Sequence, residues 1–275
     1  MNSTIKICIS LVLLTWGICN PAQSHVNESK SSLPWPFGQA EPFSGPIATD
    51  RPSFSPAVST VPKGHIQFET GYTFTYDDRN PDVTTHTFPE TLLRIGLTET
   101  FEARVEWPTQ IYINDGRRVN GLNDLALGFK KQVIQQSKWI PQFTVVGRLF
   151  IPTGDKNITS NHVNPELQAV MSYAFNDTFS AFGTANIGGA SNGNKRFARF
   201  SSSLGLGVNL ATSLSGFVEY FGLYPVEQAI QDTHFIQTGI VYQLTYHLQL
   251  DARIGTGLNH GTDDLLTGAG LSWRF

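Results

Sequence analysis

A strict alternation of apolar and polar residues recurs along most of this sequence. Between Lys63 and Tyr76, mostly apolar or aromatic side chains stand at every second position, with polar residues or glycine between them. A period of two predicts a β-strand with one apolar face. The same pattern recurs in later segments, so the sequence predicts an all-β chain of about 12 strands. We expect these strands at residues 64–76, 88–98, 100–108, 122–133, 140–151, 164–175, 178–188, 197–209, 213–224, 233–244, 247–257 and 264–275.

The lengths of these strands and of their connections favour a membrane barrel over a soluble sandwich. A typical predicted strand has about eleven residues, which suits a tilted strand that crosses a bilayer, whereas strands of soluble sheets average about five or six. Long connections follow the odd-numbered strands, and short turns follow most of the even-numbered ones. This segregation is typical of a transmembrane antiparallel β-barrel, whose turns lie in the periplasm. The long connections are expected at residues 77–87, 109–121, 152–163, 189–196, 225–232 and 258–263.

The composition agrees with a barrel wall and excludes two other classes of protein. Charged residues make up 15% of the chain, below the roughly 25% of an ordinary soluble domain. The mean hydropathy of −0.14 excludes a bundle of membrane-spanning helices. The formal net charge of −3 leaves no basic excess for binding a polyanion, so no nucleic-acid partner is expected.

The first 24 residues have the features of a secretory signal peptide. Lys6 precedes an apolar stretch over residues 7–18, and the small residues Ala22 and Ser24 fit a cleavage site. The stretch is too short to span a bilayer as a helix, and an N-terminal helix of the mature fold is the alternative. Cleavage would remove both cysteines of the chain, so the exported protein would have no disulfide bond. We expect export to the outer membrane of a Gram-negative bacterium.

Residues 25–62 do not alternate and are rich in proline and serine. They form either a disordered periplasmic linker or a plug folded into the lumen. Aromatic residues such as Trp35 and Phe54 make the segment too apolar for a pure linker, so we favour an ordered, inward-folded segment. The expected organisation is a signal peptide at residues 1–24, this segment at residues 25–62 and an outer-membrane barrel at residues 63–275.

The polar face of the predicted strands would line the barrel lumen. It carries seven acidic and seven basic residues, whereas a pore selective for one sign of ion needs an excess of the other sign. We therefore predict weak charge selectivity, with cross-strand ion pairs that stiffen the wall. A purely structural role is the alternative for each of these residues. The candidates are Glu69, Glu90, Glu102, Glu106, Glu166, Glu219, Asp251, Arg94, Arg104, Lys130, Arg148, Arg199, Arg253 and Arg274.

Aromatic residues gather near the ends of the predicted strands, where their rings suit the membrane interface. The last strand ends in Leu271, Trp273 and the terminal Phe275. A terminal phenylalanine on an alternating strand resembles the signal by which bacterial barrels are recognised for assembly. We expect two kinds of partner besides a small-molecule solute, namely the lipid of the outer membrane and, through Phe275, the barrel-assembly machinery.

The sequence contains no motif for catalysis or cofactor binding. It has no glycine-rich phosphate loop ending in Lys-Ser or Lys-Thr, no His-Glu-x-x-His motif and no Gly-x-Ser-x-Gly elbow. Its seven histidines include no pair at metal-ligand spacing. We therefore predict no enzyme, no catalytic residue, no metal site and no cofactor. The alternative is an outer-membrane hydrolase, which would need a Ser–His pair on the lipid face, and on the predicted register no serine and histidine face each other near the strand ends.

Several motifs resemble those of the meta-pathway phenol-degradation family of outer-membrane proteins. The resemblance covers about residues 48–275, and Asn123 stands where the family's motif would have glycine. Members of this family are called transporters and are linked to the uptake of aromatic or other hydrophobic compounds, so the resemblance implies an outer-membrane β-barrel transporter. The motifs are Thr49-Asp50-Arg51-Pro52, residues 61–69, Gly121-Leu122-Asn123-Asp124-Leu125, residues 149–155 and Leu248-Gln249-Leu250-Asp251.

The expected function is passive diffusion of small hydrophobic or aromatic solutes through the barrel. A ring of twelve strands is wider than the eight that side chains can fill, and narrower than the sixteen to eighteen of a general porin. Small solutes can therefore pass wherever no segment blocks the lumen.

Overall fold

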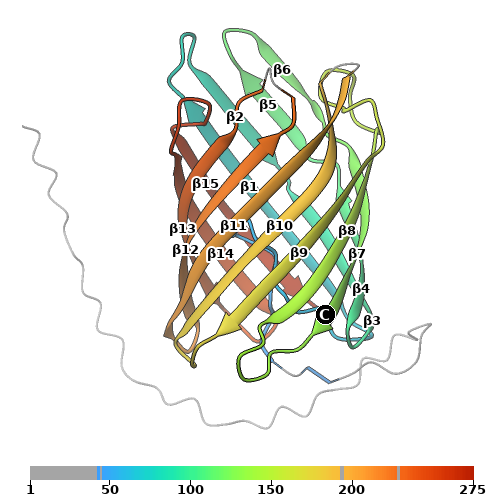
Figure 1. Ribbon diagram of the computed structural model, residues 1–275, viewed down its shortest axis with the longest axis vertical. Helices are drawn as coiled ribbons and strands as arrows, with labels where there is room; N and C mark the ends of the chain where they lie inside the picture. The colour runs from blue at the N-terminus through green and yellow to red at the C-terminus, as the bar shows by residue number, and fades with distance from the viewer. Residues whose placement is uncertain (1–41, 44, 193–194, 228–229) are drawn as a thin grey trace, which may run out of the picture. The chain divides into compact units, whose positions relative to one another are not determined.

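Figure 1 shows the computed structural model of the chain. It describes residues 42–43, 45–192, 195–227 and 230–275, all within one compact unit, Trp35–Phe275. The predicted signal peptide and residues 25–41 and 44 of the predicted inward-folded segment lie outside the described residues. No helix in the described part of the chain is long and apolar enough to cross a membrane.

Twelve strands close into an antiparallel barrel (Figure 1). β15 pairs with β1 through partners such as Phe68 and Trp273, and this pairing closes the ring. The predicted all-β fold and strand count are confirmed, and every strand lies within a few residues of its predicted range. The ring consists of β1 (Ile66–Asp77), β3 (Thr91–Thr98), β4 (Phe101–Trp107), β7 (Leu125–Ile134), β8 (Gln142–Ile151), β9 (Asn164–Ala174), β10 (Phe179–Asn192), β11 (Lys195–Ala211), β12 (Leu214–Pro225), β13 (Thr233–Gln243), β14 (Leu248–Gly257) and β15 (Leu265–Arg274).

Three neighbouring strands of the ring are interrupted and then continue as the short strands β2 (Val83–Phe88), β5 (Gln110–Asn114) and β6 (Arg118–Leu122). The interruptions, called the wall breaks below, fall at Pro89-Glu90, Pro108-Thr109 and Asn123-Asp124. Proline lacks the N–H that a strand ladder needs, which explains the first two. The three short strands pair with one another and with the loop end of β1. The prediction of long loops at residues 77–87 and 109–121 is therefore wrong in large part, because most of these residues belong to strands.

The alternation places apolar side chains outside the ring and polar side chains inside it. Leu204 and Ile254, on the outer face, are 68% and 54% exposed, whereas the inward-facing Glu69, Arg94 and Lys130 are fully buried. This arrangement is the reverse of the core of a soluble protein. A closed ring with an apolar outer wall and a polar lumen suits a lipid bilayer.

Candidate functional site

Residues 45–62, called the inner segment below, lie inside the barrel against the polar faces of the strands. At the turn end of the barrel, the N–H of Ile47 donates to Tyr246 O over 3.0 Å. Further along, Gln67 donates to Ala48 O and Thr144 to Val58 O. Because wall side chains bind its backbone, the inner segment takes one defined path through the turn half of the lumen.

Asp50 lies at the centre of a buried group of three acids and three bases. Its carboxylate accepts hydrogen bonds from Lys130 Nζ over 2.7 Å and from Arg104 over 2.5 Å, and Arg94 lies 3.3 Å away. Buried ions are tolerated when they are paired, and removing one partner leaves an uncompensated charge. The group, called the Asp50 cluster below, consists of Asp50, Glu69, Glu102, Arg94, Arg104 and Lys130.

A second anchor joins the inner segment to β12 and β13, across the ring from the Asp50 cluster. The carboxylate of Glu219 accepts from the N–H of Phe54 over 2.7 Å and from that of Ser55 over 2.9 Å. The Phe54 ring stacks on Phe221 with centroids 4.6 Å apart, and Phe221 stacks on Phe235 at 4.8 Å. The inner segment is thus held by charge on one side and by backbone amides and stacked rings on the other.

Arg51 forms a third anchor, between the two others. Its guanidinium donates to Glu90 over 2.7 Å and to Ala269 O over 3.1 Å. A Cβ atom at Gly71 or Gly270 would stand 2.2 Å from atoms of this guanidinium. These two glycines of the alternating strands β1 and β15 therefore make room for an arginine of the inner segment.

The predicted lumen residues divide into two groups by what they contact. Arg148 pairs with Glu106 over 3.1 Å and with Glu166, and Arg199 lies 3.6 Å from Glu166, so these four belong to the wall alone. The others contact the inner segment directly. They are Glu69, Glu90, Arg94, Glu102, Arg104, Lys130, Glu219, Asp251, Arg253 and Arg274.

The sequence analysis did not single out Asp50 and Arg51 as partners of the lumen charges. Both stand in the motif Thr49-Asp50-Arg51-Pro52, which pointed only to a family. An adjacent acid and base in an otherwise weakly charged segment was the available signal. With both included, the seven acids and seven bases of the wall gain one acid and one base, and the charges stay balanced.

A cavity of about 370 Å³ adjoins the inner segment. Its lining includes Asp50 and Phe54 of the inner segment, together with residues of all three wall breaks, namely Glu90, Thr109 and Asn123-Asp124. Trp107 also lines it, although this residue is 64% exposed. The cavity therefore reaches the wall where the strand ladder is broken.

At the wall breaks, a side chain replaces part of the backbone ladder. The N–H of Thr109 donates to Asn123 Oδ1 over 2.6 Å, and the N–H of Asn123 donates to Thr109 O over 3.0 Å. Asn123, which departs from the expected glycine, thus supplies an acceptor where the continuous ladder stops.

One serine and one histidine of the outer face lie in the same row, although they do not face each other on neighbouring strands. Ser202 on β11 and His234 on β13 lie in one row across β12, with Gly222 between them. The Tyr224 hydroxyl stands 3.3 Å from Ser202 Oγ, whereas His234 Nδ1 is bonded to Tyr220 over 2.6 Å. A serine nucleophile needs a base within hydrogen-bond reach, and here two tyrosines stand between them.

Three carboxylates converge at the loop end, those of Asp77, Asp78 and Asp264, whose oxygens lie within 4.8 Å of one another. The negative charge of Asp264 raises the pKa of Asp78. Hard cations prefer oxygen ligands of this kind. The three belong to the outer ends of the strands and do not line the lumen cavity.

Comparison with solved structures shows the same fold. The COG4313 outer membrane channel from Pseudomonas putida F1 superposes with a TM-score of 0.63 at 13% identity, covering 79% of this chain and 98% of that chain. The NanC porin gives a TM-score of 0.51 at 10% identity, covering 76% and 100%. The KdgM porin, solved in complex with disordered oligogalacturonate, gives 0.50 at 8% identity, covering 77% and 99%. The chain therefore has the fold of bacterial outer-membrane barrels.

The sequence comparisons identify the family. A search of curated proteins finds no match. The model of the family described as "Putative MetA-pathway of phenol degradation" matches residues 49–275, which include the inner segment from Thr49 onward and every strand of the barrel. With its apolar outer wall, the barrel lies in the bacterial outer membrane. The chain belongs to this family of phenol-degradation outer-membrane proteins.

Proposed function

We propose that this protein is an outer-membrane channel through which small hydrophobic or aromatic solutes diffuse passively. The observation that carries the proposal is the lumen cavity, which is bounded by the inner segment on one side and reaches all three wall breaks. Membership of a phenol-degradation family and a fold shared with an outer membrane channel support it.

The cavity also suggests the route of the solute. The inner segment lies in the turn half of the lumen, so a solute that enters from the loop end meets it before reaching the periplasm. The wall breaks offer a second exit, because fewer ladder hydrogen bonds must be broken there and because the outward-facing Trp107 already borders the cavity. Transfer of an apolar solute from the cavity into the bilayer is more favourable than its transfer into water, because the bilayer keeps its apolar surface away from water.

A reversible cross-link at the wall breaks tests this route. Cells expressing the protein are expected to take up radiolabelled toluene several-fold faster than cells without it. The double variant Thr109→Cys/Asn123→Cys should lose this gain when oxidised and recover it after reduction, because a disulfide would fix the two interrupted strands together. Initial uptake rates measured with and without reductant provide the comparison.

The matched control is the pair Ala252→Cys/Ala269→Cys, which are cross-strand partners on β14 and β15 away from the breaks. This disulfide should leave uptake unchanged. If expression of the wild-type protein does not increase toluene uptake, the proposal of a channel function is wrong. If uptake survives the disulfide at the breaks, the solute leaves by another route.

The hydrolase alternative gains no support from the geometry of the outer face. Ser202 and His234 share a row, but their polar atoms are bonded to Tyr224 and Tyr220 and not to each other. The structures with which this chain shares its fold include an outer membrane channel and two porins.

We also propose that residues 1–24 are a cleaved signal peptide and that the segment at 25–62 acts as a plug. For the described part of that segment, the three anchors on Asp50, Phe54 and Arg51 support the second statement.

The terminal Phe275 is proposed as the contact for the barrel-assembly machinery. Its N–H and C=O both bond to Ile66 over 2.9 Å, so its backbone closes the ring, while its side chain is 49% exposed beside Trp273. Phe275→Ala keeps the backbone bonds and removes the ring. It should lower the amount of folded, heat-modifiable barrel in the outer membrane several-fold, whereas Phe175→Ala, at a turn-end ring that is 60% exposed, should not. Equal yields of the two variants would refute a specific role for Phe275.

A further inference from the structure

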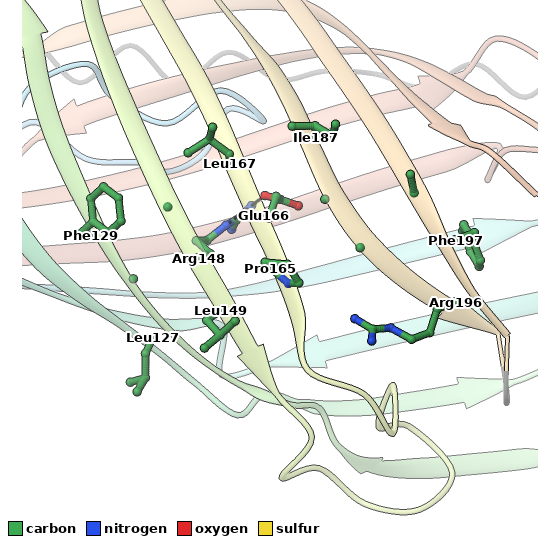
Figure 2. Close-up of a pocket in the computed structure, with 15 residues that line it drawn as sticks. Leu127, Phe129, Arg148, Leu149, Pro165, Glu166, Leu167, Ile187, Arg196 and Phe197 are labelled. Atoms are coloured by element: carbon green, nitrogen blue, oxygen red, sulfur yellow. Dashed lines mark hydrogen bonds and ion pairs between the residues drawn. The ribbon is translucent and has the colours of Figure 1, made fainter.

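A larger groove, of about 820 Å³, lies on the outer face of the barrel over β7–β11 (Figure 2). The apolar side chains of Leu149, Leu167 and Ile187 border it, and each is between 42% and 50% exposed. The lining also includes several small residues, Gly189 and Ala198 among them. The groove is thus a depression in the lipid-facing surface of the barrel, and apolar side chains border it.

One cation stands at the loop end of this groove. Arg196 follows the loop between β10 and β11, and its Nη2 donates to Val163 O over 2.9 Å, just before β9. Figure 2 shows its side chain extended towards Pro165. The other arginine of the lining, Arg148, is occupied by ion pairs with Glu106 and Glu166 inside the barrel.

Arg196 has no acidic partner among the residues that the structure describes, since the ion pairs in this part of the wall involve only Arg148 and Arg199. Lys195 precedes it and is also exposed. A guanidinium binds phosphate through parallel N–H···O bonds, and positive charge beside a membrane surface attracts anionic lipid. In outer-membrane barrels the loop end lies at the outer leaflet.

We propose that this groove binds one phosphorylated lipid of the outer leaflet, with an acyl chain against Leu149, Leu167 and Ile187 and a phosphate on Arg196. An apolar groove that ends at a guanidinium with no acidic partner among the described residues matches an amphiphile with a long hydrocarbon chain and an anionic head. The site lies on the outer face and is independent of the lumen cavity and of the proposed channel function.

Native mass spectrometry of the full chain, released from detergent micelles with added lipid A, tests the site. The wild-type protein should retain one lipid A molecule. Arg196→Gln should weaken retention roughly tenfold, the usual effect of losing a hydrogen bond to a charged group. Ala198→Trp, at an exposed position of the lining, should weaken it as strongly by filling the groove. Inorganic phosphate should not compete at millimolar concentration, because it lacks the acyl chain.

Two matched variants separate this site from general lipid contact. Arg117→Gln removes an exposed arginine from the β5–β6 turn, and Ala185→Trp adds a ring to an exposed position of β10 outside the lining. Both should bind lipid A like the wild type. Equal losses in these controls, or unchanged binding in Arg196→Gln, would overturn the proposal. Palmitic acid bound as tightly as lipid A would also overturn it, since the phosphate would then contribute nothing. If Ala198→Trp fails to fold, the comparison of lipid A binding between Arg196→Gln and Arg117→Gln tests the proposal.

Discussion

Deleting residues 45–60 is expected to raise the single-channel conductance of the barrel several-fold. The inner segment lies in the turn half of the lumen, where wall side chains bind its backbone at Ala48, Val58 and Ser59. Without it, the polar inner faces of the strands would face water, and ions could pass from the loop end to the turn end. Planar-bilayer recordings of the refolded protein measure the change.

The deletion also tests the predicted charge balance of the lumen. It removes Asp50 and Arg51 together, so the wall keeps equal numbers of the predicted acids and bases. The reversal potential in a salt gradient should therefore stay near zero, as expected for a pore without an excess of either sign. A shift towards the potential of a perfectly selective pore would contradict the prediction of weak charge selectivity.

The control for the deletion is a chain that lacks residues 25–40, an equal length of the same proline-rich stretch. This variant keeps all three anchors of the inner segment and should conduct like the wild type. If both deletions give the same conductance as the intact chain, the inner segment does not block the pore and the plug proposal fails.

Asp50→Asn should have the largest effect of any single substitution on how tightly the inner segment is held. The carboxylate of Asp50 balances part of the positive charge of Arg94, Arg104 and Lys130, which are almost fully buried. In the variant, only Glu69 and Glu102 remain in the cluster to balance these three cations. Breaking a buried ion pair by removing one partner costs about 3–5 kcal/mol. A loss of about 3 kcal/mol corresponds to an increase on the order of 100-fold in the fraction of released segment.

Thiol modification measures this release. In a Ser53→Cys background, the rate of reaction with a membrane-impermeant maleimide should rise on the order of 100-fold when Asp50 is also changed to Asn. Asp78→Asn, which removes a carboxylate from the loop end, should leave the rate unchanged. Adding Lys130→Gln to Asp50→Asn restores the charge balance and should recover part of the loss, and the double-mutant cycle gives the coupling free energy. An unchanged maleimide rate in Asp50→Asn would show that the cluster does not hold the segment.

The positions of the strands could be predicted from the sequence because the requirement is local. In β1, the side chains from Ile66 to Tyr76 point alternately to lipid and to the lumen. A period of two is therefore visible in the sequence without knowledge of the partner strand. The same holds for β12 to β15, whose ranges were found within a few residues. The wall breaks were missed because Pro89, Pro108 and Asn123-Asp124 interrupt the alternation and make the strands beyond them look like loops.

The contacts of Asp50 could not be predicted in this way. Asp50 is 44 residues from Arg94 and 80 from Lys130 in the sequence, and nothing local requires them to meet. The same is true of Ser202 and His234, whose shared row depends on the registers of β11 with β12 and of β12 with β13.

The alternation by itself determined a barrel of twelve strands with a polar, charge-balanced inner face, because the two sides of each strand must satisfy two different solvents. Only the tertiary structure decided what that inner face binds. Ring closure and register bring charges from four strands around one carboxylate of the inner segment. On the outer face, the same registers align small residues into a groove that ends at Arg196. Both arrangements arise from spacing across strands, which the order of residues along any one strand does not contain.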